Sequence, residues 1–145
     1  MSKDLVTEID IEAPADRVWQ ILTDFASYPS WNPFVRKIEG PVQEGAQLEV
    51  ALQPPGRGPS TFRPKIVKVV PGRELRWLGH LGVSGLFDGE HRFQIEPLDG
   101  SRVRFVHAER FDGLLASPLL RSIGESTRQG FQAMNEALKS RAEGG

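Results

Sequence analysis

The sequence predicts an α+β fold in which one long helix, at the C-terminal end of the chain, covers one face of an antiparallel sheet. Three patterns predict it. Apolar and polar residues alternate near the start of the chain, short alternating segments separated by turn residues fill residues 35–111, and an apolar stripe with helical spacing runs through residues 118–141. A sheet with one apolar face needs a second layer over that face, and the C-terminal helix supplies it.

The first elements are a strand and two short helices. Over residues 5–12, every second residue is Leu, Thr or Ile, which is the period of a strand with one buried face. Pro14 then suits a first helical turn, and apolar residues recur at helical spacing as far as Phe25. Pro29 and Pro33 disfavour helical angles in the residues before them, so we expect the helical segment to end there.

Residues 35–111 are expected to form an antiparallel meander of about six strands, which makes about seven with the first. The breaks between them fall at residues 39–41, 44–45, 53–60, 70–73, 81–85 and 97–101. The covering helix is expected from about Pro118 to Arg141. Its apolar stripe consists of Leu120, Ile123, Thr127, Phe131, Met134 and Leu138.

Composition and charge exclude several classes of protein. The chain has 145 residues, of which 39% are hydrophobic and 26% charged, with no cysteine and a formal net charge of −1. These values are ordinary for a folded globular protein, and they leave no disulfide, thiolate nucleophile or Cys-ligated zinc site. The balanced and scattered charge argues against a nucleic-acid partner. No segment is apolar enough for a signal peptide or an integral membrane segment, so we expect a cytoplasmic protein.

We expect one domain over residues 1–145, because a chain of this length can bury roughly 70% of its unfolded surface around a single core. Residues 142–145 are expected to be a frayed tail. The sequence has no dinucleotide loop, no phosphate loop and no Gly-x-Ser-x-Gly elbow. We therefore expect no cofactor, and the oligomeric state stays open.

Two stretches of the chain resemble a known family. They are residues 13–34, with Ala13-Pro14, Val18-Trp19, Leu22-Thr23-Asp24-Phe25, Tyr28-Pro29 and Trp31-Asn32-Pro33-Phe34, and residues 85–93, Gly85-Leu86-Phe87-Asp88-Gly89-Glu90-His91-Arg92-Phe93. Together with the order of the elements, they resemble the START-like (SRPBCC) superfamily, in its bacterial polyketide cyclase/dehydrase-like branch. The resemblance implies a helix-grip fold, in which a bent antiparallel sheet of about seven strands wraps around the long C-terminal helix. It also implies a ligand cavity between the sheet and that helix, and no metal.

Three ionisable residues fall on the apolar face of the last predicted hairpin. If residues 97–101 form its turn, Ile95 pairs with Val103, and the same register sets His91 opposite His107 and Gly89 opposite Glu109. Buried ionisable groups need partners, so His91, His107 and Glu109 are candidates for three different roles. They could form a structural hydrogen-bond network, a polar patch that orients a ligand and supports acid/base chemistry, or a metal site of two histidines and a carboxylate.

Further candidates for lining a ligand site lie in the apolar part of the predicted fold. Each could equally be an ordinary core residue, and Trp31 is expected to pack under the short helices. These candidates are Trp31, Trp77, Phe87, Phe93, Phe105, Leu115, Ile123, Thr127 and Phe131, in addition to the two histidines and Glu109.

The first half of the C-terminal helix has small residues on the side that faces the sheet. A glycine inside a helix costs about 1 kcal/mol relative to alanine, so Gly124 and Gly130 need a reason. They leave room for a ligand, let the backbone approach the sheet closely, or allow a bend in the helix. The hydroxyl of Thr127 could point into a cavity or bond to its own helix.

The function expected from these observations is binding of a small hydrophobic molecule that is aromatic, polyketide-like or lipid-like. Cyclase- or dehydratase-type acid/base chemistry is compatible with it, with His91, His107 or Glu109 moving a proton. The alternative is a non-catalytic carrier of a lipid or quinone, or a protein-interaction module that uses the apolar segment at Leu114 and Leu115.

Overall fold

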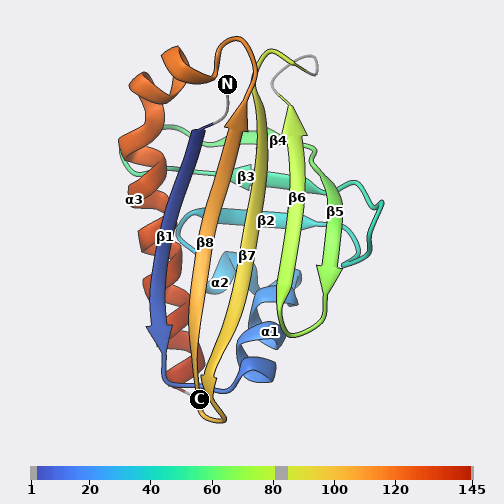
Figure 1. Cartoon of the computed structure of the whole chain (residues 1–145), viewed down its shortest axis with the longest axis vertical. Coiled ribbons are helices and arrows are strands. Elements are labelled where there is room, and N and C mark those ends of the chain that lie inside the picture. Colours follow the sequence, from blue (N-terminus) through green and yellow to red (C-terminus); the bar gives the residue numbers. More distant parts are fainter. Residues whose placement is uncertain (1–2, 81–84, 145) are drawn as a thin grey trace.

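The computed structural model describes residues 3–80 and 85–144. In that part of the chain, a five-stranded antiparallel sheet has the order β1-β8-β7-β6-β5, and a three-stranded antiparallel sheet has the order β2-β3-β4 (Figure 1). The strands are β1 (Lys3–Ile11), β2 (Val35–Glu39), β3 (Glu49–Leu52), β4 (Ser60–Phe62), β5 (Lys65–Val70), β6 (Glu74–His80), β7 (Asp88–Asp99) and β8 (Arg102–Asp112).

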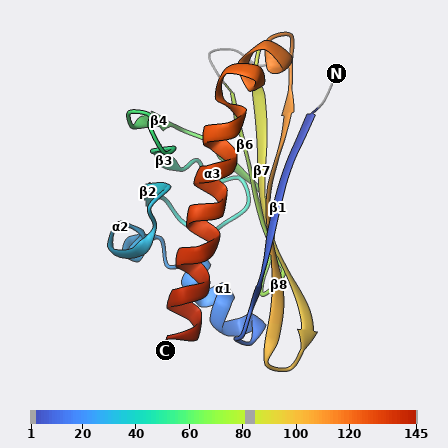
Figure 2. The ribbon, with the colours of Figure 1, turned by 90° about the vertical axis from the view of Figure 1, so that its left-hand side faces the viewer.

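The helices lie on one side of the larger sheet. Figure 2 shows the long helix running along the inner face of the five-stranded sheet, with β2 to β4 on its other side. They are α1 (Ala15–Thr23), the short 3-10 helix η1 (Phe25–Ser27), α2 (Tyr28–Trp31) and α3 (Ala116–Glu143). The predicted α+β architecture, with short helices after the first strand and a long helix at the C-terminal end, is confirmed.

The sheet is divided where one continuous strand was expected. Pro64 separates β4 from β5 because it has no N–H to donate to the strand ladder. Its carbonyl accepts a hydrogen bond from the backbone N–H of Leu48 (2.8 Å), and a bridge pairs Gln47 with Lys65. These bonds join the two sheets at one corner, so the strands form the bent surface that was predicted, with one more strand than the seven expected.

The register of the last hairpin differs from the predicted one by two residues. Ile95 pairs with Phe105, and His91 pairs with Glu109. The cause is the turn, because Asp99 accepts a hydrogen bond from the backbone N–H of Ser101 (2.8 Å), which shortens the turn and lets both strands run further than expected. A shift of two residues keeps every side chain on its face, so the two histidines and Glu109 stay on the inner side.

The C-terminal half of α3 closes the core. Phe131, Met134 and Leu138 are fully buried, and the helix continues through Ala142, which is also buried. The next residue, Glu143, accepts a hydrogen bond from the backbone N–H of Glu12 (2.7 Å). The helix therefore extends beyond Arg141 into the segment expected to be a tail. No helix in the described ranges has both the length and the apolar character needed to cross a membrane.

Candidate functional site

A pair of buried histidines stands at the centre of the inner face. His91 on β7 and His107 on β8 are almost completely buried, and their Nε2 atoms lie 2.6 Å apart. The Nδ1 atom of His107 lies 2.9 Å from Oδ1 of Asn135 on α3. Asn135 also donates from Nδ2 to the hydroxyl of Thr7 on β1 (2.9 Å), so the network joins four elements of the fold.

The hydrogen bond of Thr7 to a backbone carbonyl fixes the direction of every other hydrogen bond in this network. The Thr7 hydroxyl lies 2.8 Å from the backbone carbonyl of His107, which can only accept, so Thr7 donates its single proton there. Thr7 must then accept from the Nδ2 group of Asn135, which turns the amide oxygen towards His107 Nδ1. His107 therefore carries its proton on Nδ1, and its Nε2 atom must accept from the Nε2–H group of His91.

Burial keeps both rings neutral. Desolvation lowers the pKa of His107 to about 3, against a smaller raising effect of its bond to Asn135. Desolvation, helped by the nearby His107, also holds the pKa of His91 well below its usual range. A neutral His91 that donates through Nε2 has a lone pair on Nδ1, on the side of the ring away from His107.

Glu109 faces that lone pair. Its Oε1 atom lies 3.5 Å from Nδ1 of His91, and its side chain retains 17% of its exposure although it shares the inner face with the buried histidines. Burial raises the pKa of Glu109 to about 8, so the carboxyl group holds a proton at neutral pH. Its other oxygen, Oε2, occupies the space over Gly89 that a side chain there would fill.

Aromatic rings fill the space around the histidine pair. The ring of Phe131 stacks on His107 with centroids 4.0 Å apart, and Phe93 lies 4.7 Å from the same ring. Trp77 lies 5.2 Å from His91, and Phe105 packs against both Phe93 and His107. The middle of the predicted cavity is therefore a packed aromatic core. The indole Nε1 of Trp77 is sealed in this core and has no hydrogen-bond partner among the described residues.

The N-terminal half of α3 is packed much less tightly. Ile123 is only half-buried, and nothing lies within 4 Å of the position that a Cβ at Gly124 would occupy. At Gly130, by contrast, a Cβ would overlap the ring of Phe34. The first glycine therefore borders open space, and the second allows a close approach. The hydroxyl of buried Thr127 donates to the carbonyl of Ile123 (2.9 Å), within the same helix.

The remaining predicted residues lie at the two ends of the molecule. Phe87 is half-buried and stacks on Phe111 with centroids 5.4 Å apart, next to the loop that leads into α3. Leu115 is the residue before α3, and its N–H bonds to the carbonyl of Leu86 (2.8 Å). Trp31 packs edge-on against Tyr28, 5.1 Å between centroids, at the other end of the molecule. The predicted ligand residues on β6, β7, β8 and α3 therefore share the inner face. Phe87 and Leu115 lie at the end of the sheet where α3 begins, and Trp31 lies apart from the rest.

Three of the surface pockets among the described residues have other linings, which do not include His91, His107 or Glu109. The first, of about 520 Å³, lies between α1 and the end of α3 and includes Trp31 and Arg17. The second, of about 480 Å³, lies beside Gly130 under the segment of residues 53–57. The third, of about 280 Å³, is on the outer face of the sheet.

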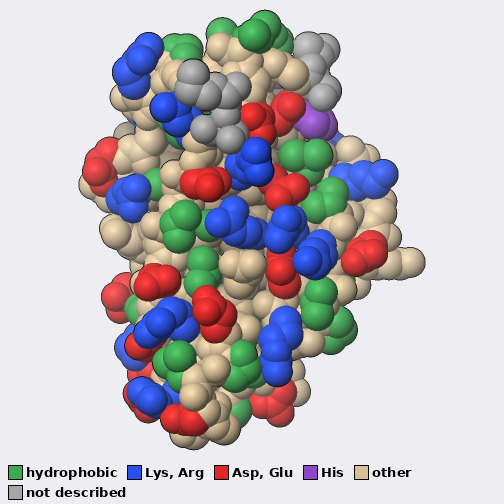
Figure 3. Space-filling view, in the orientation of Figure 1, with side chains coloured by type: hydrophobic (Ala, Val, Ile, Leu, Met, Phe, Trp, Pro, Cys, Tyr) green, Lys and Arg blue, Asp and Glu red, His purple; other side chains and the backbone are tan. Residues whose placement is uncertain are grey.

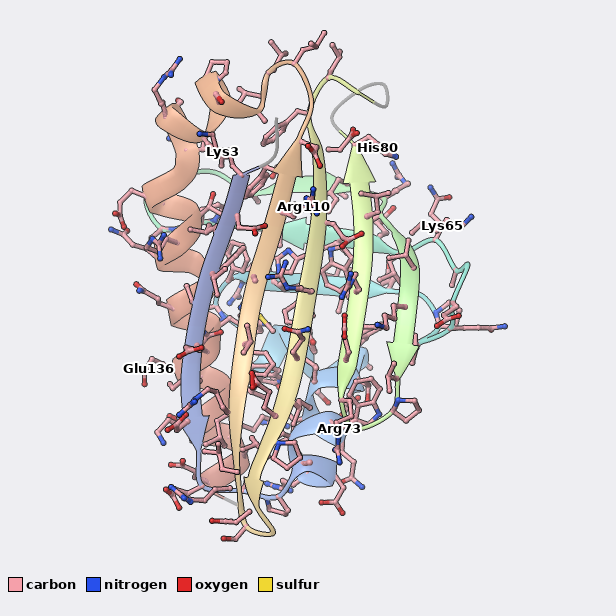
Figure 4. All side chains as sticks on the ribbon, viewed as in Figure 1. Lys3, Lys65, Arg73, His80, Arg110 and Glu136 are labelled. Carbon is pink, nitrogen blue, oxygen red and sulfur yellow. The ribbon has the colours of Figure 1, made fainter. Side chains whose placement is uncertain are left out.

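The outer face of the sheet carries charges of both signs. Figure 3 shows Lys and Arg side chains interspersed with Asp and Glu over this face. Arg110 and His80 belong to its upper part in Figure 4, and His80 pairs with Asp88 (2.8 Å). These residues lie on the side of the sheet opposite to the histidine pair.

Sequence reasoning missed Thr7 as a polar group of the network and missed Asn135 altogether. Asn135 follows Phe131 by four residues, so a polar residue on the apolar side of the helix was a usable signal. Thr7 was recognised only as an inward position of the first strand.

The spacing of the two histidines does not fit a metal site. A metal ion held by both histidines through Nε2 would separate these atoms by roughly 3.3 Å, more than the 2.6 Å observed.

Comparison with known proteins places the chain in a family. Residues 3–143 match the family profile described as polyketide cyclase / dehydrase and lipid transport. No curated protein sequence matches the chain. Several solved structures share its fold.

The Zhui aromatase/cyclase from Streptomyces sp. R1128 has a TM-score of 0.78 and 18% identity, over 99% of this chain and 94% of the other. Norcoclaurine synthase from Thalictrum flavum has a TM-score of 0.75 and 15% identity, over 99% and 96% of the two chains. A START superfamily protein from Mycobacterium smegmatis has a TM-score of 0.72 and 18% identity, over 97% of each. The fold is thus that of the START-like superfamily, and the chain belongs to its polyketide cyclase/dehydrase and lipid transport family.

Proposed function

We propose that this protein binds a small hydrophobic molecule between the N-terminal half of α3 and the inner face of the five-stranded sheet, next to Glu109. The observation that carries the proposal is the partial exposure of Glu109. This residue lies on the same face as the fully buried histidines, yet 17% of its side chain is exposed, so solvent reaches the inner face at this point.

The residues around this opening are those of an apolar site with one polar anchor. Ile123 and Leu120 on α3 are half-buried, and Phe87 and Phe111 stack at the same end of the sheet. Small-molecule sites are mostly apolar, with a few polar groups that set the orientation of the ligand. Glu109 would supply that polar contact here.

The family supports a hydrophobic ligand of this kind. Its description names polyketide cyclases, dehydrases and lipid transport, all of which handle apolar or partly apolar molecules. An aromatic, polyketide-like or lipid-like ligand fits the apolar surroundings of Glu109. The cytoplasm is the compartment that we propose for the protein.

Acid/base chemistry is the enzymatic form of this proposal. Glu109 combines a raised pKa of about 8 with access to solvent, which are the properties of a group that exchanges protons with a ligand near neutral pH. His91 and His107 are sealed behind it, so they would act through Glu109 rather than on the ligand.

The alternative is a non-catalytic carrier or interaction module, and one observation favours it. Leu114 is 83% exposed and Leu115 42% exposed, at the same end of the molecule as the opening. Exposed leucines beside a ligand entrance would suit transfer of a lipid or quinone to a membrane or partner. The two forms differ in turnover, because a carrier releases its ligand unchanged.

Native and denaturing mass spectrometry of gently purified protein, followed by titration with 2-methoxynaphthalene, tests the binding site. We expect extra mass that is lost on unfolding, or saturable binding of the probe. Gly124→Phe should abolish either signal because its ring would occupy the open space beside the helix. Glu125→Phe, at the adjacent exposed position, is the matched control and should bind as the wild type does. A bare mass with no saturable binding would overturn the proposal.

A further inference from the structure

The hydrogen-bond network of the histidine pair dictates which kind of group Glu109 offers to a ligand. The donor and acceptor of each bond are set by the bond before it. The chain of bonds starts at the carbonyl of His107, passes through Thr7 and Asn135, and places a proton on Nδ1 of His107. This proton leaves Nε2 of His107 as an acceptor and Nε2 of His91 as a donor. The Nδ1 atom of His91 then faces Oε1 of Glu109 with a lone pair, at 3.5 Å.

Two lone pairs facing each other would repel, so the proton of the neutral carboxyl group of Glu109 belongs on Oε1, the oxygen that faces Nδ1 of His91. His91 stays neutral because it is buried. The second oxygen of Glu109, Oε2, then carries no proton and is a hydrogen-bond acceptor.

The position of Oε2 makes it available to a ligand. It lies over Gly89, where only the absence of a Cβ leaves room for it. Some buried side-chain polar atoms of the described chain lack partners and are sealed from solvent, but the oxygens of Glu109 are not among them. Exposure of the side chain, at 17%, is therefore consistent with an oxygen that reaches the opening.

We propose that Oε2 of Glu109 accepts a hydrogen bond from a hydroxyl group of the ligand, while Oε1 carries the carboxyl proton on the side of His91. The ligand class is thus an apolar molecule with an O–H donor, such as a phenol, an enol or an alcohol. This inference rests on the proposed binding site and specifies what the site selects. His91 is a positioning residue in it, since it acts on the ligand only through Glu109.

The charged groups around Glu109 leave this arrangement undisturbed. From β7 it faces His91, and from β1 it faces Leu5, its register partner. Lys3, further along the same side of β1, is exposed. The buried residues of α3 include no charged side chain in the part that the structure describes.

A matched pair of ligands tests the inference. 2-Naphthol and 2-methoxynaphthalene have similar shapes, and only the first has a hydroxyl donor. At pH 6.5 we expect the wild type to bind 2-naphthol roughly tenfold more tightly, which is the value of one hydrogen bond of ordinary strength. Glu109→Met should bind both compounds equally, and Glu90→Gln, on the outer face of the same hairpin, should keep the preference.

Equal affinity of the wild type for both compounds would overturn the hydroxyl contact and leave the binding site standing. Binding of neither compound would overturn the site itself, and the contact with it. A readout that needs no ligand is the long-range ¹H–¹⁵N spectrum of the histidine rings. We expect His107 to carry its proton on Nδ1 and His91 on Nε2, and the opposite tautomers would overturn the placement of the carboxyl proton on Oε1.

Discussion

The two halves of α3 both contain a glycine, but they differ in how tightly they pack. In the C-terminal half, Gly130 receives the ring of Phe34, and Phe131 stacks on His107 without a gap. In the N-terminal half, Gly124 has nothing beside it, and Ile123 is only half-buried. The same helix is thus a core element at one end and loosely packed at the other.

This difference teaches where a ligand can be accommodated without loss of the fold. Interiors packed like the C-terminal half lose several kcal/mol when a large side chain is removed, so they cannot also be empty. The histidine network belongs to this packed half, and Glu109 lies beside it, 3.5 Å from His91. The packed core and the proposed ligand site therefore use separate stretches of one helix.

The largest expected effect is on the packed half. Phe131→Ala should reduce the free energy of unfolding by about 3–5 kcal/mol, because it removes a ring from a fully buried aromatic cluster. Ile123→Ala in the open half should cost about 1 kcal/mol or less, since its side chain is half-exposed. Urea denaturation measures both values, and equal losses would remove the distinction between the two halves.

The next effect comes from the ionisation of Glu109. Its pKa of about 8 in the folded protein exceeds its ordinary value of 4.5, so the folded state binds more protons between these pH values and the free energy of unfolding falls as pH rises. The histidines, with lowered pKa values, contribute only below about pH 6.5.

Between pH 6.5 and 8 we therefore expect a loss of about 2 kcal/mol from Glu109 alone, from 1.36 kcal/mol per pH unit. Glu109→Gln should remove this loss because its amide does not ionise. Thermal or urea unfolding of both proteins across this range is the measurement. A wild-type curve that stays flat, or a variant that falls in parallel with it, would contradict the assignment.

Alanine at the two glycines should shift stability in opposite directions. Gly130→Ala should destabilise the protein by about 1–3 kcal/mol, because the added Cβ overlaps the ring of Phe34. Gly124→Ala should stabilise it by up to about 1 kcal/mol, since alanine favours the helix and meets no atom there. The melting temperatures of the two variants report the sign directly, and a gain at both positions would show that Gly130 is not in close contact.

The smallest effect is expected at Thr127. Among the described residues its hydroxyl bonds only to the carbonyl of Ile123 in its own helix, so Thr127→Val should change the free energy of unfolding by less than about 0.5 kcal/mol. The affinity for 2-methoxynaphthalene should also be unchanged. A large loss of affinity with unchanged stability would show instead that the Thr127 hydroxyl contacts the ligand.

The fold and the inner face could be predicted from local patterns, and the site geometry could not. Strand alternation placed His91, His107 and Glu109 on one face even though the predicted register was wrong by two residues, because a shift of two preserves the face. The turn at Asp99, which caused the shift, depends on side-chain hydrogen bonds within the turn. Asn135 and Thr7 join the network from the two ends of the chain. The spacing of Asn135 from Phe131 marks an inward polar residue, but no periodic signal shows which partner it meets.

The most direct test of the central claim is the location of a bound ligand along α3. We would label the methyl groups of Leu and Ile with ¹³C, add 2-methoxynaphthalene, and follow the methyl shifts by NMR. We expect saturable shifts at Leu120 and Ile123, with Leu138 and Ile66 unaffected. Shifts concentrated at Leu138, or at Ile21 in the pocket beside Trp31, would contradict it.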